Sequence, residues 1–272
     1  MLYNKKVGVG IVTYNRPAGL RKLLDSLAGA PVDEIIVVND GKIYQEFDDL
    51  DATIIHNEKN LGVGKSKNIA LRHLQKKGVE YFFLIEDDIY IKDSEVFREY
   101  IKAARVSGIQ HFNYSQHGPN NRDENGVASP ATVINYENIS VPLYGFCVGA
   151  FSFYTRKCLS KVGLMDEAYY NAMEHVDHTY EIIKAGMHPP FCYFADIADS
   201  ARYLGDEEWS EAQSTICRNN GYDQIKFQAI NYFIEKHGGH PVDLFRDITH
   251  EQVAKAVIKI RSLHGVPVFK LR

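Results

Sequence analysis

The chain has 272 residues, of which 45% are hydrophobic and 24% charged, as expected for a globular protein with a substantial core. Its formal net charge of −4 at pH 7 gives no reason to expect nucleic acid as a partner. No apolar stretch has the length needed to cross a bilayer, and the short N-terminal apolar run lacks a signal-peptide pattern. The four cysteines are widely spaced, which favours reduced thiols. We therefore expect a cytoplasmic protein whose contact with a membrane, if any, is peripheral at its inner face.

The first half of the chain alternates predicted strands and helices. A β-rich run covers residues 7–12, and Pro17 then opens a helix in which leucines repeat at helical spacing. Further strands are predicted at residues 34–38, 53–55 and 81–85, with a glycine-led helix before the last of them. The resulting β-α-β-β-α-β order predicts a mostly parallel sheet with right-handed crossover connections.

The second half of the chain is less regular. Residues 113–130 are rich in Asn, Gly, Pro and Ser, and we predict a mobile loop there. Strands are expected at residues 145–154 and 191–197, with a short helix ending near Gly163 after the first of them. A further helix is predicted over residues 172–185 because a glycine follows it as a C-terminal cap.

Helical periodicity dominates the end of the chain. Amphipathic helices are predicted around residues 225–234 and 253–260. We therefore expect an α/β domain over residues 1–205 and a helical C-terminal extension over residues 206–272 that packs on it.

Three consecutive carboxylates follow the apolar strand predicted at residues 81–85. Glu86, Asp87 and Asp88, the acidic triplet, then lie at the C-terminal end of a strand, where open α/β sheets bind their ligands. Like charges at this spacing repel one another and need compensation from water, a basic partner or a cation. A hard divalent metal ion that also holds a diphosphate accounts for them, and a solvated turn is the alternative.

Polar residues also follow two other predicted strands, at residues 13–16 and 39–41. Tyr14 offers a nucleotide a planar surface for its base, and Asp40 and the acidic triplet offer carboxylates for the ribose and for a phosphate-bound cation. Each segment alone also fits a turn or a helix entry. Because all three occur at equivalent strand ends, we predict one binding crevice.

Two lysines occupy the first turn of the helix predicted after residue 62. The run Gly62-Val63-Gly64-Lys65 lacks the spacing of a phosphate-binding P-loop. Lys65 and Lys67 nevertheless oppose the helix dipole, an unfavourable effect that an anionic ligand would cancel. A solvated basic helix face is the alternative.

The motifs TYNR, VVNDG, NLGVGKSKN and FLIEDD occur in an order that resembles the GT-A nucleotide-sugar glycosyltransferases, specifically the large inverting family two. The resemblance covers roughly residues 5–200, and residues 149–163 together with Met165-Asp166-Glu167 are similar to the segment before that family's catalytic helix. It implies a GT-A, Rossmann-like α/β fold with a mostly parallel sheet flanked by helices and a helical C-terminal segment.

Carried over by position, the resemblance implies a donor site at the strand ends. Lys67 stands where the family has an arginine, which keeps the charge but loses the planar fork. Asp88 corresponds to the family's direct metal ligand, and Mn²⁺ or Mg²⁺ is the expected ion. His237 and His240 either join the metal ion or belong to a simple turn. The expected donor contacts are Thr13, Tyr14, Arg16, Asp40, Lys67, Glu86 and Asp87, and the expected metal ligands are Asp88, Asp87 and His178.

Residues 174–178 correspond to the family's catalytic helix. A histidine, His175, stands where the family often has its general-base aspartate. The base is therefore Glu174, Asp177 or His175 itself, since imidazole titrates near neutrality. An ordinary polar helix start is the alternative.

The resemblance implies an inverting, hexosyltransferase-type glycosyltransferase. It would move a sugar from a nucleotide diphosphate, with UDP as the default, to a hydroxyl of a saccharide or glycoconjugate in polysaccharide or glycoconjugate synthesis. Two other classes remain open. A sugar nucleotidyltransferase would need a Gly-rich nucleotide loop where this chain has residues 13–16. A noncatalytic sugar-nucleotide-binding protein would suit the substituted pair Glu174 and His175, although the intact acidic triplet argues against it.

Overall fold

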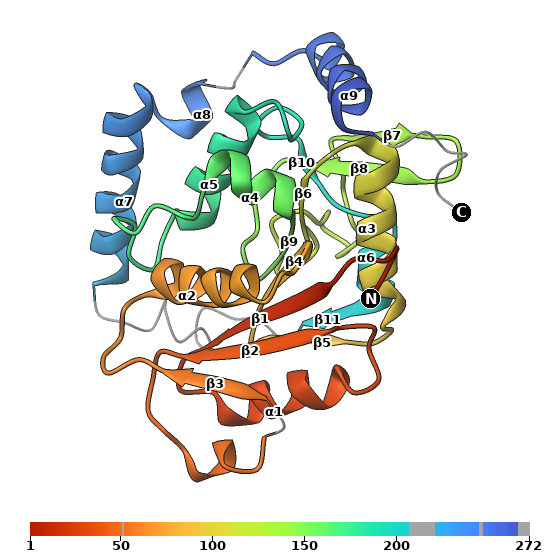
Figure 1. Cartoon of the computed structure of the whole chain (residues 1–272). Coiled ribbons are helices and arrows are strands. Elements are labelled where there is room, and N and C mark those ends of the chain that lie inside the picture. Colours follow the sequence, from red (N-terminus) through yellow and green to blue (C-terminus); the bar gives the residue numbers. More distant parts are fainter. Residues whose placement is uncertain (51, 207–220, 245–246, 266–272) are drawn as a thin grey trace.

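The computed structural model describes residues 1–50, 52–206, 221–244 and 247–265. Its centre is a six-stranded sheet with the strand order β3-β2-β1-β4-β9-β6 (Figure 1). Strands β1 to β4 are parallel, β9 is antiparallel to β4, and β6 is antiparallel to β9. The mostly parallel α/β sheet predicted from the sequence is thereby confirmed. The strands are β1 (Val7–Thr13), β2 (Glu34–Asn39), β3 (Thr53–His56), β4 (Tyr81–Glu86), β6 (His111–Asn113) and β9 (Phe151–Thr155).

Helices cover both faces of this sheet. The helices are α1 (Pro17–Ser26), α2 (Val63–Lys76), α3 (Glu95–Ser107), α4 (Arg156–Val162) and α5 (Glu174–Lys184). Apolar residues of α1 and α3 share one core cluster with β1 and β4, and those of α2, α4 and α5 share a second cluster. A Cβ added at Gly8 or Gly10 of β1 would come within 2.8 Å of side-chain atoms of Leu74 or Ala70 on α2. The two glycines therefore let α2 lie close to β1.

Two smaller sheets and the C-terminal helices complete the described part of the fold. Strand β5 pairs with β11, and β7, β8 and β10 form a three-stranded antiparallel sheet. Helix α9 begins with a capping box of Thr249 and Gln252, and its Val253 and Ile260 join the main core. The additional elements are η1 (Gln45–Phe47), β5 (Ile89–Ile91), β7 (Thr132–Asn135), β8 (Ser140–Tyr144), β10 (Phe194–Ala195), α6 (Ser200–Tyr203), β11 (Leu204–Asp206), α7 (Tyr222–His237), α8 (Pro241–Leu244) and α9 (His250–His264).

Two predicted strands are shorter in the structure. The strand expected over residues 145–154 begins only at β9, and just before it the carbonyl of Gly149 accepts a hydrogen bond from the Lys67 ammonium at 3.0 Å. The strand expected over residues 191–197 is reduced to β10, because Cys192 adopts a left-handed conformation with φ of 63°. Apolar runs alone do not show where the backbone turns.

The segment 113–130, predicted to be a loop, is organised by two polar side chains. The guanidinium of Arg122 donates to the carbonyls of Gln116 and Gly126, at 2.7 and 3.0 Å. Asn121 exchanges two hydrogen bonds with the backbone of Phe146, just before β9. These contacts hold the segment against the C-terminal side of the central sheet.

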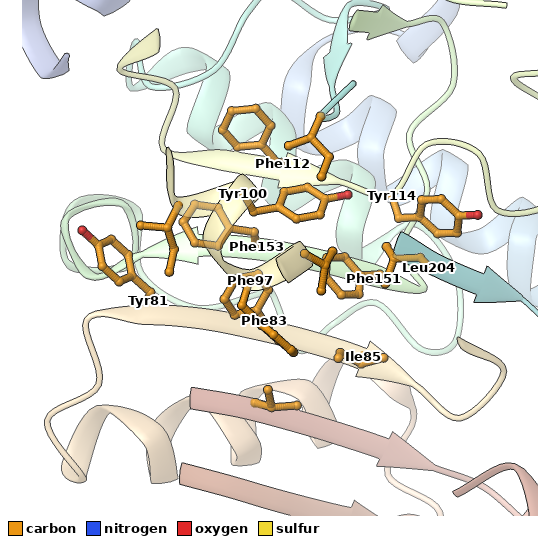
Figure 2. Close-up of a cluster of buried hydrophobic side chains, with 14 of the residues drawn as sticks. Tyr81, Phe83, Ile85, Phe97, Tyr100, Phe112, Tyr114, Phe151, Phe153 and Leu204 are labelled. Carbon is orange, nitrogen blue, oxygen red and sulfur yellow. The ribbon is translucent and has the colours of Figure 1, made fainter. Parts of the chain in front are cut away.

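An aromatic cluster packs against one face of β4, as Figure 2 shows. The ring of Phe83 lies 4.8 Å from that of Phe97 on α3 and 5.0 Å from that of Phe153 on β9. Tyr100 and Phe151 pack beside them with ring centroids 5.1 Å apart. Because buried aromatic contacts stabilise their neighbours strongly, this cluster holds β4 and the residues that follow it in place.

Within the described ranges, every helix is too short or too polar to span a bilayer. Cys147, Cys158 and Cys192 are free thiols. The fourth cysteine, Cys217, lies outside the described residues.

Candidate functional site

Asp87 joins the acidic triplet to the end of β1. Its Oδ2 accepts hydrogen bonds from Thr13 Oγ1 at 2.6 Å and from the backbone N–H of Tyr14 at 3.3 Å. The guanidinium of Arg16 lies 3.6 Å from its Oδ1. Burial raises the pKa of Asp87 to about 7, although Thr13 and Arg16 act in the opposite direction. The structure therefore brings the ends of β1 and β4 together, and Asp87 connects them by its hydrogen bonds.

Asp88 lies beside two residues that the sequence analysis did not single out. His117 Nε2 is 3.7 Å from Asp88 Oδ2, and His117 Nδ1 is 3.4 Å from Asp206 Oδ2. Burial would lower the pKa of His117, but Asp206 and Asp88 outweigh it and raise that pKa. His117 comes from the segment predicted to be a loop. Asp206 reaches the site because β11 pairs with β5, where Asp206 lies opposite Ile89.

The donor set around Asp88 suits a divalent cation. Asp88 Oδ1 is buried and has no hydrogen-bond partner among the described residues. Carboxylate oxygens are the preferred ligands of Mg²⁺ and Mn²⁺, and imidazole nitrogen is also a ligand for transition metals. Within the described ranges, no three His, Cys, Asp or Glu side chains already form a ligand cluster. The residues present therefore fit an ion that takes its other ligands from a bound diphosphate or water.

Asp40, at the end of β2, organises the chain that leads into α2. Its Oδ1 accepts hydrogen bonds from Asn57 Nδ2 and from the backbone N–H of Leu61, both at 2.8 Å. Its Oδ2 accepts one from the N–H of Gly62 at 2.9 Å. Gly62 has φ of 89°, a conformation that favours glycine. The polar end of β2 therefore lies at the start of α2.

Lys67 is a buried cation between the acidic triplet and α5. Its Nζ lies 2.6 Å from Glu86 Oε1, 3.0 Å from Gly149 O and 3.4 Å from Glu174 Oε1. Burial would lower the pKa of Lys67, but Glu86 and Glu174 outweigh it and raise that pKa. These three acceptors match the three N–H donors of the ammonium group. The structure thus places Lys67 in an ion-pair bridge, and its contact with a donor phosphate stays a prediction.

Glu174 and His175 form a carboxylate–imidazole pair at the start of α5. Glu174 Oε1 lies 3.1 Å from His175 Nδ1, and Glu174 is only 3% exposed. Burial would raise the pKa of Glu174, but His175 and Lys67 outweigh it and hold that pKa well below its usual range. The imidazole lies against Gly149, where an added Cβ would come 2.8 Å from His175 Cγ. An ionised carboxylate therefore faces one ring nitrogen of His175.

The other two predicted residues of α5 have different surroundings. Asp177 contacts Tyr169 Oη at 3.0 Å, Lys236 Nζ at 2.9 Å and His237 Nε2 at 2.7 Å. Asp177 lies about one helical turn further along α5 than Glu174, and its contacts there are with Tyr169 and α7 instead of with the acidic triplet. The structure therefore engages Asp177 in a contact between helices, and its role as the base stays a prediction.

His178 and the late histidines have partners away from Asp88. His178 Nε2 lies 3.1 Å from the carbonyl of Gly163, and its ring packs against Tyr154 with centroids 5.4 Å apart. His237 contacts Asp177, and His240 Nδ1 accepts a hydrogen bond from the N–H of Val242. None of these contacts supports a metal-binding role, and we do not include the three histidines in the candidate metal site.

The sequence has relatives that can be recognised along most of its length. The family model for glycosyl transferase family 2 matches residues 8–163. An uncharacterized glycosyltransferase of Acanthamoeba polyphaga mimivirus is 27% identical over 249 residues, which cover 85% of this chain and 93% of the relative.

Solved structures resemble the fold at low sequence identity. GalNAc-T7 with UDP, GalNAc and Mn²⁺ has a TM-score of 0.62 at 12% identity, covering 96% of this chain and 55% of its own. The mannosyltransferase PcManGT from Pyrobaculum calidifontis, with GDP-Man and Mn²⁺, has a TM-score of 0.52 at 13% identity, covering 97% of this chain and 88% of its own. TarS of S. aureus in complex with UDP has a TM-score of 0.50 at 15% identity, covering 94% of this chain and 80% of its own. The chain thus spans about half the length of the GalNAc-T7 chain, and these likenesses show a GT-A fold.

Proposed function

Because the chain belongs to glycosyl transferase family 2, we propose that it moves a sugar from a nucleotide diphosphate donor, a UDP-sugar, to a hydroxyl of a saccharide or glycoconjugate. The observation that carries this proposal is the Lys67 bridge, which places Glu86 of the acidic triplet and Glu174 of α5 on one ammonium group. Donor carboxylates and candidate base then lie in one site. The ligands named for the similar structures, UDP with Mn²⁺ and GDP-Man with Mn²⁺, support a nucleotide-sugar donor.

The residues that would hold a divalent ion are Asp88 and His117, and Asp206 would orient the imidazole through its Nδ1. The support is the buried, unpartnered Oδ1 of Asp88 and the position of His117 between the two carboxylates. A bound Mn²⁺ or Mg²⁺ would neutralise negative charge on the departing nucleoside diphosphate. Arg16, 3.8 Å from Asp88 Oδ2, contributes a further positive charge at the same place.

His175 is the general base of the proposed reaction. Its Nδ1 faces the ionised Glu174, so the second ring nitrogen is the one that takes a proton from the acceptor hydroxyl. Glu174 orients the imidazole and stabilises the imidazolium that forms, and Lys67 holds Glu174 in place. The hydroxyl oxygen then attacks the anomeric carbon as the diphosphate leaves from the opposite face. A single displacement of this kind inverts the configuration at that carbon.

A nucleotide-sugar screen tests the donor site. Thermal stability and donor hydrolysis are measured with and without Mn²⁺ for the wild type, for Asp88→Ala and for a control, Asp25→Ala, at an exposed position of α1. We expect one nucleotide to raise the melting temperature in the presence of Mn²⁺, because a ligand that binds the folded state stabilises it. The wild type and the control should respond alike, and Asp88→Ala should not respond. If no nucleotide stabilises the wild type under any metal condition, the transferase proposal is wrong.

Product analysis tests the chemistry. NMR of the transferred sugar should show inverted anomeric configuration, and retention would contradict the role given to His175. If nucleotide binds but neither hydrolysis nor transfer occurs with any donor, a noncatalytic binding protein of the same fold becomes the better description.

A further inference from the structure

Tyr170 is a large aromatic side chain exposed beside Asp40. It is 41% exposed, although most aromatic residues of the described chain are buried. A Cβ added at Gly62 would come 2.7 Å from Tyr170 Cδ2, so the ring lies directly against the Gly62 backbone. The N–H of Gly62 donates to Asp40 Oδ2 at 2.9 Å. The ring of Tyr170 therefore lies at the edge of the predicted nucleotide crevice.

The loop that carries Tyr170 is held on two sides. Asn171 Oδ1 accepts a hydrogen bond from the N–H of Val63, at the first turn of α2, at 2.9 Å. On the other side, Asp166 contacts Lys236 Nζ of α7 at 2.8 Å. Asn171 has φ of 55°, a left-handed conformation that is uncommon for residues other than glycine. The surrounding contacts thus fix an unusual backbone next to Tyr170, as is often seen at binding sites.

A second exposed tyrosine follows the neighbouring strand. Tyr14 is 37% exposed, and its backbone N–H is fixed by Asp87 at the end of β1. Burial raises the pKa of Tyr170, and the charges of Asp40 and Tyr14 act in the same direction. The N–H of Asp40 donates to the carbonyl of Thr13 at 3.0 Å, so the backbone that carries Tyr14 lies beside Asp40.

The hydrogen bonds of Asp40 indicate which group of a ligand its carboxylate can still bind. Its carboxylate takes three hydrogen bonds within the described residues, two on Oδ1 and one on Oδ2. A carboxylate has about four acceptor positions, so Oδ2 can accept one more N–H. Uracil has a single ring N–H on its pairing edge and a flat π-face on each side. It matches one remaining acceptor beside the exposed ring of Tyr170.

We propose that Tyr170 forms a wall of the nucleobase site, on which the uracil of the donor stacks beside Asp40. This inference rests on the proposed function, because it concerns the same donor site. Stacking on an aromatic side chain contributes to affinity through the base and not through the diphosphate, so the two parts of the ligand can be tested separately.

The experiment is calorimetric titration of Mn²⁺-loaded protein with UDP and with inorganic pyrophosphate, which has no base. The variants are Tyr170→Ala, Tyr170→Phe and a control, Phe227→Ala, at a position of α7 that is 64% exposed. We expect Tyr170→Ala to weaken UDP binding by about 5- to 50-fold and to leave pyrophosphate binding unchanged. Tyr170→Phe should bind UDP like the wild type, because it keeps the aromatic face, and so should the control.

Two results would overturn the inference alone. If wild type and Tyr170→Ala bind UDP equally well, the base does not stack on Tyr170. If Tyr170→Ala loses UDP and pyrophosphate to the same extent, the ring only supports the loop around Gly62. Failure of the wild type to bind any nucleotide would instead overturn the donor-site proposal together with this inference.

Discussion

Glu174 and His175 are neighbours in the chain with opposite environments. Glu174 is buried between Lys67 and His175, whereas the side chain of His175 is 23% exposed and lies against Gly149. Glu174 shares the buried ammonium of Lys67 with Glu86, so taking up a proton would remove one of the two negative charges that balance this cation. Imidazole can gain and lose a proton without breaking the Lys67 bridge. At the scale of single residues, the structure therefore favours His175 for proton transfer and Glu174 for positioning.

Replacing His175 tests this division of roles. We expect His175→Gln to lower kcat by about 10²- to 10⁴-fold, because general-base catalysis contributes that range. Binding of UDP and the KM for the donor should change little, because the contact of His175 with Glu174 is not a donor contact. Steady-state kinetics and calorimetry measure the two quantities, with His250→Gln at an exposed position of α9 as the control. Undiminished turnover in His175→Gln would assign the proton transfer to another group.

At the scale of elements, α7 fixes the loop between α4 and α5. Lys236 bridges Asp166 in this loop and Asp177 on α5, at 2.8 and 2.9 Å. Tyr169, in the same loop, packs against Tyr232 of α7 with ring centroids 5.0 Å apart. Because the loop also contacts the start of α2, a helix far along the chain helps to position one side of the proposed donor site.

Replacement of Lys236 tests that connection. Lys236→Met removes the ammonium from the three polar partners of the buried Asp177, so we expect the free energy of unfolding to fall by about 1–2 kcal/mol. The loop around residues 164–173 should also exchange its amide hydrogens faster, and UDP should bind more weakly. Urea unfolding, hydrogen exchange and calorimetry measure these changes. Lys226→Met, at an exposed position of the same helix, is the matched control, and equal behaviour of the two variants would contradict the role given to α7.

At the scale of the whole molecule, buried titratable groups make stability depend on pH. Burial lowers the pKa of His111, His178 and His188, in the last case to about 4. The contacts of His188 agree with a neutral ring, because Nε2 accepts from the N–H of Ala195 and Nδ1 faces the carbonyl of Pro189. Burial also raises the pKa of Asp196, to about 6, which acts with the opposite sign.

His188 gives a measurable contribution with a definite sign. Between about pH 6.5 and 4 the unfolded chain binds a proton at this residue and the folded protein does not, so its stabilising effect is lost as the pH falls. Comparison of His188→Gln with the wild type cancels the effect of Asp196 and the other groups. The difference in free energy of unfolding should shrink by about 2 kcal/mol between pH 7 and pH 5. Urea unfolding at both pH values measures it, and a constant difference would show that His188 titrates normally in the folded state.

The order of strands and helices and the polar strand ends were accessible from the sequence alone. Apolar periodicity, Pro17 at a helix start and the acidic triplet after β4 are local patterns, and local patterns specify local structure. The strand expected over residues 145–154 was too long, and the contact of the Gly149 carbonyl with Lys67, from a distant part of the chain, leaves no mark in the apolar run.

The tertiary structure decided which polar groups meet. Glu174 and Asp177 are three residues apart on one helix, yet Glu174 contacts Lys67 and Asp177 contacts α7. His117, from the segment 113–130, lies beside Asp88, and Asp206 lies beside His117 in the strand β11 that pairs with β5. No local sequence pattern marks either residue. The sequence by itself thus determined the kind of fold and which strand ends carry polar residues, since both follow from short-range patterns. Only the tertiary structure decided the partners of these polar residues, since contacts between distant segments depend on how the whole chain packs.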